Sequence, residues 1–255
     1  MRKALLSLFA IAAFTSSAAI AAPQVTIDFN NPIWGTGSSK IDPILATIHF
    51  PNSSNPDLTQ STRVNAGRFV GTASNFVNVS PEIFYKNENE VYMYCYDVYN
   101  HITGGDTVVY DIDFEGATKR TLQFIDAVNR VLSGDGDYNP YAWVTPTNRL
   151  QAGAIQLGLW ESLYDTDWSL TTNTGKFYTT NVTAGVIAQA NTFFASIDED
   201  SAIDQKFTMV LRNASRQDMI TADPPVNGVP TPATLLLMLP ALAGLAISTR
   251  RRRQA

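Results

Sequence analysis

Two segments of the sequence carry residue types that can react with each other. The chain has one cysteine, Cys95, within the run Tyr94-Cys95-Tyr96-Asp97, and a glutamine, Gln156, further along. A thiol that attacks a glutamine carboxamide expels ammonia and leaves an internal thioester. This electrophile lasts only while it is shielded from water, and it can acylate an amine or a hydroxyl of a target. The pair therefore predicts covalent attachment, with Cys95 as the acyl-bearing thiol and Gln156 as the acyl donor.

The residues around Gln156 suit a shielded contact. In a helix, Ala152 and Gly153 lie one turn before Gln156, and Leu159 and Trp160 lie one turn after it. The small residues allow a strand to approach the helix backbone closely, and the indole can exclude water. We therefore expect the strand that carries the cysteine to pack against this helix.

The hydrophobic periodicity changes along the chain and indicates how these segments are positioned. Alternating or β-branched runs dominate the first half, and apolar residues at helical spacing dominate the second half. We expect an α+β domain with a strand-rich N-terminal half and a helical C-terminal half. The expected strands are residues 24–29, 46–50, 91–99, 107–114 and 206–212, and the expected helices are residues 121–132, 147–164 and 184–196.

The first residues have the order of a secretion signal. Arg2 and Lys3 precede an apolar stretch, residues 4–14, and small residues follow it. The triplet Ala19-Ile20-Ala21 provides a cleavage site, so we predict a signal peptide at residues 1–21. The mature ectodomain would then span residues 22–222.

The last residues resemble a membrane tail. Residues 223–232 are proline-rich and predict a linker, and residues 233–248 carry no charge. Arg250, Arg251, Arg252 and Arg253 follow directly. We expect residues 233–255 to form an inner-membrane helix with the arginines in the cytoplasm, so that the ectodomain lies outside.

The charge balance narrows the choice of partners. The chain has 18 basic and 23 acidic residues, and removing the six basic residues of the two ends leaves an ectodomain with a net charge of about −11. Such a surface repels phosphate backbones, so nucleic acid is not an expected partner. A single cysteine cannot form an internal disulfide, which calls for another explanation in an exported chain.

The two reactive segments together resemble the thioester domains of bacterial surface adhesins. Tyr94-Cys95-Tyr96-Asp97 is similar to the cysteine segment of that family, and Ile155-Gln156-Leu157-Gly158-Leu159-Trp160 is similar to its glutamine segment, with Gly158 where alanine is usual. The resemblance spans roughly residues 67–197. It implies a Cys95–Gln156 thioester and adhesion to a surface amine or hydroxyl, with no turnover chemistry and no cofactor or metal.

The tail resembles the PEP-CTERM sorting domain. Val229-Pro230-Thr231-Pro232-Ala233-Thr234 precedes the apolar stretch and the arginine cluster, with Thr231 in the place of the family's glutamate. The resemblance implies recognition by an exosortase-type enzyme at Pro230 and Pro232. Its other implications are a membrane-anchored precursor, release to the cell surface, and a role with exopolysaccharide in a biofilm matrix.

Other interpretations of the reactive residues remain open. Gln151 is a weaker acyl donor, because no tryptophan follows it at helical spacing. Cys95 with His101 or His49 would form the dyad of a cysteine hydrolase.

A non-covalent protein is the main alternative. Trp34, Trp143 and Trp168 could stack sugars in a structural or carbohydrate-binding matrix protein with an inert Cys95. The acidic run at residues 135–139 resembles the start of a calcium loop, but Pro140 replaces the glycine that such a loop needs, which favours a plain turn.

Overall fold

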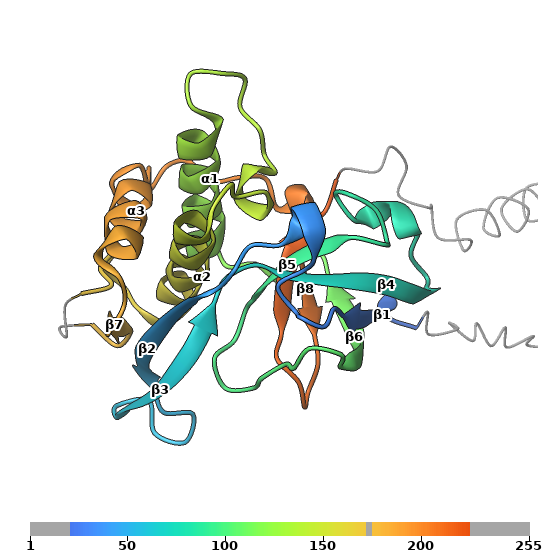
Figure 1. The fold of residues 1–255 in the computed structure, drawn as a ribbon, viewed down its shortest axis with the longest axis horizontal. Coiled ribbons are helices and arrows are strands. Elements are labelled where there is room, and N and C mark those ends of the chain that lie inside the picture. The colour runs from blue at the N-terminus through green and yellow to red at the C-terminus, as the bar shows by residue number, and fades with distance from the viewer. Residues whose placement is uncertain (1–20, 172–174, 225–255) are drawn as a thin grey trace, which may run out of the picture.

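Six antiparallel strands close into a barrel, and a second sheet and three helices lie on one side of it (Figure 1). The computed structural model describes residues 21–171 and 175–224. The barrel order is β1-β4-β5-β9-β8-β6, and the second sheet has the order β3-β2-β7. The strands are β1 Gln24–Phe29, β2 Ile44–Pro51, β3 Thr59–Ala66, β4 Phe69–Val77, β5 Val91–Cys95, β6 Thr107–Asp113, β7 Tyr178–Thr180, β8 Thr208–Arg212 and β9 Met219–Ala222.

The predicted division into a strand half and a helical half is wrong. The last two strands, β8 and β9, return to the barrel and lie between β6 and β5, so the strands of both chain ends form one closed sheet. The described residues form only three α-helices, which are α1 Lys119–Ser133, α2 Arg149–Tyr164 and α3 Ala184–Ala195. Barrel closure satisfies the edges that an open sheet would leave unpaired.

The membrane helix expected at residues 233–255 lies outside the described residues. Within the described part of the chain, no helix is both long and apolar enough to cross a membrane.

The helices begin and end close to the predicted residues, for local reasons. Thr118 caps α1 by accepting a hydrogen bond from the backbone N–H of Thr121, and Asn148 caps α2 by accepting from the N–H groups of Leu150 and Gln151. Gly134 ends α1 with a positive φ of 59°.

Helix α2 is the central helix of the group, and almost all of its faces are covered. It packs against α1, α3 and the β2–β3 hairpin, and it is buried from Ala152 to Ser162. Two glycines allow this close packing: a Cβ at Gly153 would overlap Ile44 of β2, and a Cβ at Gly158 would overlap Phe124 of α1. Gly158 therefore stands where even alanine would not fit.

The chain leaves the barrel at a buried carboxyl group. Asp223 follows β9, is 8 % exposed, and its Oδ1 has no hydrogen-bond partner. Burial raises the pKa of Asp223 from 3.8 to about 7. Between about pH 4 and pH 7, the carboxyl group of Asp223 is therefore protonated in the native state and ionised in the unfolded chain.

This shift predicts a pH-dependent stability. The raised pKa of Asp223 adds to the free energy of unfolding. This added stability is fully present below the pKa of the unfolded chain, and it is lost as the pH rises through about 7. Urea unfolding of the wild type and of Asp223→Asn should show the wild type losing stability relative to the variant across this window. Parallel stability curves for the two proteins would contradict the prediction.

Candidate functional site

The structure brings Cys95 and Gln156 together in the interior. The backbone N–H of Cys95 donates to Oε1 of Gln156 (N···O 2.9 Å), and Nε2 of Gln156 donates to the backbone carbonyl of Cys95 (N···O 2.8 Å). Cys95 is 3 % exposed and Gln156 is completely buried. The carboxamide of Gln156 is thus held on both sides by the residue whose thiol is proposed to attack it.

The end of a neighbouring strand makes this contact possible. Strand β4 pairs with β5 only as far as Met93, opposite Phe69, while β9 continues on the other edge to Cys95, opposite Met219. At Cys95 the β4 edge of β5 is therefore open. At this open edge, the carboxamide of Gln156 forms the two N–H···O hydrogen bonds with the backbone of Cys95 that a neighbouring strand would otherwise form.

We expected the cysteine strand to pack against the small residues of α2, and the structure shows a different strand there. The strand that meets Gly153 is β2, through Ile44, and not the cysteine strand. Cys95 instead reaches α2 at Gln156 itself. The small residues before Gln156 place the helix against the hairpin, and the glutamine side chain spans the remaining gap to β5.

The other residues of the cysteine segment fix β5 in position. The hydroxyl of Tyr94 donates to the backbone carbonyl of Trp143 (3.2 Å), and the hydroxyl of Tyr96 accepts from the backbone N–H of Thr118 at the start of α1 (3.0 Å). Both rings are buried.

Asp97 builds the turn that follows Cys95. Its Oδ1 accepts from the N–H groups of Tyr99 (2.8 Å) and Asn100 (2.9 Å), and its Oδ2 accepts from the N–H of Asp218. The last contact fixes the turn to the start of β9. Burial raises the pKa of Asp97, against the effect of these hydrogen bonds.

The electrostatics of the pair favour an intact thiol over a thiolate. Burial, and secondly the charge of Asp97, raise the pKa of the Cys95 thiol well above its usual value. An ionised sulfur of the kind that a hydrolase needs is therefore disfavoured here. The backbone N–H of Cys95, by contrast, already points at the oxygen where negative charge would develop during attack on the carboxamide.

A cavity of about 550 Å³ lies beside Cys95. Cys95 and Trp160 form part of its wall, together with residues of β3 and of the loop after β5. Trp160 is 2 % exposed, which fits its expected role as a shield.

The alternative residues are placed differently. His101 is exposed and lines the same cavity as Cys95. His49 stacks on Tyr178 with a centroid separation of 4.2 Å and does not line the cavity. Gln151 accepts from the N–H and the hydroxyl of Thr147 at the start of α2, so its carboxamide is used as a local cap.

The tryptophans do not form one stacking platform. Trp143 is completely buried, Trp34 packs on Phe69, and Trp168 lies under the guanidinium of Arg120. Each ring is thus used in packing at a separate place.

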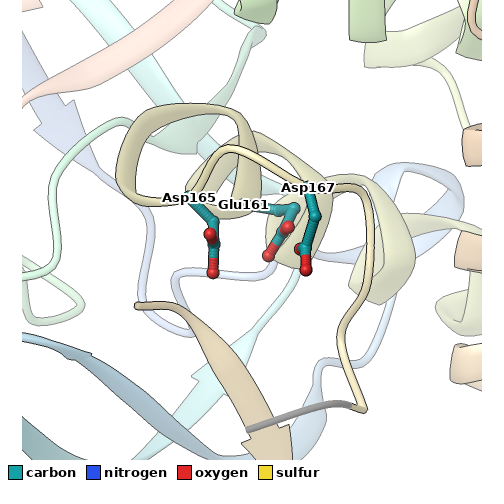
Figure 2. A group of neighbouring side chains, drawn as sticks. All are labelled: Glu161, Asp165 and Asp167. Carbon is teal, nitrogen blue, oxygen red and sulfur yellow. The ribbon is translucent and has the colours of Figure 1, made fainter. Parts of the chain in front are cut away.

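A group of three carboxylates was not predicted as a site. Glu161, Asp165 and Asp167 converge at the C-terminal end of α2 (Figure 2). The i, i+4 spacing of Glu161 and Asp165 was the available signal. Asp167 lies beyond the helix end, where the sequence does not define its direction. The acidic run at residues 135–139 forms no such group among the described residues.

The sorting and topology residues cannot be placed in this fold. Pro230, Thr231 and Pro232 lie outside the described residues, as do Arg250, Arg251, Arg252 and Arg253 and residues 1–20 of the predicted signal peptide. Comparison of the chain with protein-family models, with curated proteins and with solved structures finds no match.

Proposed function

We propose that this chain is an exported adhesive protein that attaches covalently to an amine or hydroxyl of a surface or polymer through an internal Cys95–Gln156 thioester. The observation that carries the proposal is the pair of hydrogen bonds between the Gln156 carboxamide and the Cys95 backbone, in a fully buried site beside a cavity. Export and sorting of the chain rest on its sequence segments alone.

The proposed chemistry joins the thiol of Cys95 to the carboxamide carbon of Gln156. The Sγ–Cδ bond forms as Sγ of Cys95 adds to Cδ of Gln156, while the backbone N–H of Cys95 stabilises the charge on Oε1. The Cδ–Nε2 bond then breaks, and the thiol proton leaves on the nitrogen as ammonia. Because the thiol stays protonated, proximity of the two groups supplies the main rate advantage.

Attachment reverses the role of the sulfur. A nucleophile of the target that enters the cavity adds to Cδ, and the Sγ–Cδ bond breaks. The target becomes joined to Gln156 through an amide or ester bond, and Cys95 regains its proton from the nucleophile. The chain reacts once, so it is an adhesin and not a turnover enzyme.

The test is the intact mass of the purified protein, compared with Cys95→Ala, Gln156→Ala and Gln151→Ala variants. We expect the wild type and Gln151→Ala to lack one ammonia relative to their calculated masses, and the other two variants to show full masses. Methylamine should add its own mass only to the first two proteins. All four chains share the same ends, so processing does not affect the comparison.

A full wild-type mass with an alkylatable Cys95 after denaturation would overturn the proposal. The non-covalent matrix protein would then be the remaining interpretation, with Gln156 acting only as a structural partner of β5.

A further inference from the structure

A buried carboxylate with one unpartnered oxygen lies at the C-terminal end of α2. Glu161 is completely buried, and its Oε2 has no hydrogen-bond partner. Its Oε1 accepts a bond of 3.2 Å from the backbone N–H of Ser169, and its carboxyl group also interacts with that of Asp167. A buried acceptor in this state destabilises the fold unless another group satisfies it.

Two further carboxylates point into the same space. One oxygen each of Glu161, Asp165 and Asp167 lies within 4.8 Å of the other two, and Figure 2 shows the three side chains side by side with their carboxyl groups on the same side. Asp165 is 9 % exposed and Asp167 is exposed, so the group reaches from the interior to the surface.

One cation lies near the group, because the charges of Glu161, Asp165 and Asp167 act on the guanidinium of Arg120. Arg120 donates to the backbone carbonyls of Thr166 and Asp167 and not to the carboxylates. Asp165 accepts from the backbone N–H groups of Thr166 (2.7 Å) and Phe177 (2.8 Å), which fixes its direction. None of the ion pairs within the described residues includes a member of the group.

We propose that Glu161, Asp165 and Asp167 form a binding site for a hard divalent cation, with Ca²⁺ as the best match. The three ligands are all carboxylate oxygens, the donor type that Ca²⁺ prefers. Their separations fit around one ion, because opposite ligands of Ca²⁺ lie about 5 Å apart.

Calcium fits better than magnesium for a geometric reason. Ca²⁺ accepts about 6–8 oxygen ligands in irregular geometry, whereas Mg²⁺ requires a near-octahedral shell. Here the three carboxylates come from a helix end and the turn after it, and water can complete the shell on the exposed side of Asp167. The site does not depend on the thioester, so the two proposals can fail separately.

Calcium titration of the chelator-treated, full-length protein tests the site. By calorimetry we expect one Ca²⁺ per chain, with a dissociation constant on the order of 10⁻⁴–10⁻³ M, and a higher Tm when calcium is added. Asp167→Asn should weaken binding at least about tenfold, because it removes one of the charged ligands. Asp137→Asn, which removes the same charge from the exposed turn at residues 135–139, should bind as the wild type does.

Two results would overturn the site. One is a wild type that shows neither binding heat nor a Tm that depends on calcium. Stabilisation of the metal-free protein by Glu161→Gln would support this result, because it would indicate that the carboxylates share a proton. The other is equal weakening in Asp167→Asn and Asp137→Asn, which would indicate only general attraction of cations to an acidic protein.

Discussion

Gln156→Leu is expected to lower the free energy of unfolding by about 2–5 kcal/mol, because it removes the oxygen that accepts from the buried N–H of Cys95, together with either the amide that donates to its carbonyl or the proposed crosslink. Leucine fills most of the same volume, so a cavity contributes little to the loss. Urea unfolding followed by circular dichroism measures the effect. The slope of the unfolding free energy with urea should stay unchanged if the native state keeps its compactness.

Two control variants separate the possible causes. Gln151→Leu removes an amide from the same helix, where it only caps Thr147 at the exposed end, and should cost less than about 1 kcal/mol. Cys95→Ala also prevents the proposed crosslink, but it keeps the free carboxamide and both of its hydrogen bonds to the backbone of residue 95, so its loss should be clearly smaller than that of Gln156→Leu. Equal losses in Cys95→Ala and Gln156→Leu would show that a covalent crosslink, and not the hydrogen bonds, dominates stability.

Trp143→Ala is expected to cost about 3–5 kcal/mol of unfolding free energy, which is typical of a fully buried aromatic residue. The indole lies near-parallel to the ring of Tyr94 at a centroid separation of 5.8 Å, next to Cys95 on β5. Its backbone N–H donates to Asn129 of α1 (2.9 Å). The residue therefore joins α1 to the strand that carries the cysteine.

Trp143→Phe is the matched control for this substitution. The indole Nε1 has no hydrogen-bond partner, so removing the N–H relieves an unsatisfied donor and offsets part of the lost contact. We expect a loss of less than about 2 kcal/mol in urea unfolding. A loss as large as that of Trp143→Ala would mean that the indole N–H makes an interaction that the structure does not show.

The sequence predicted those elements whose signal is local. Helices α1, α2 and α3 were predicted from patterns within each segment, and α1 and α2, unlike α3, also begin at a side-chain cap. Strand β3 was missed because it is a polar edge strand, exposed over most of its length, and therefore lacks apolar alternation. Strand β9 has only four residues, too few for a period to appear.

The closure of the barrel depends on pairings that no local pattern encodes. Neither β8 nor β9 indicates from its own residues that it pairs with β6 or β5. For the same reason the sequence predicted the Cys95–Gln156 contact but not its geometry. That geometry depends on β4 ending opposite Met93, a property of the register between two distant segments.

The position of β9 has a mechanical consequence. Met219, at one end of this strand, lies opposite Cys95, and the chain leaves the barrel at the other end, after Ala222. A pulling force between the Cys95–Gln156 pair and the chain beyond Asp223 would therefore run along β9. Because β9 is bonded to β5 on one edge and to β8 on the other, such a load shears both ladders at once and does not unzip them bond by bond.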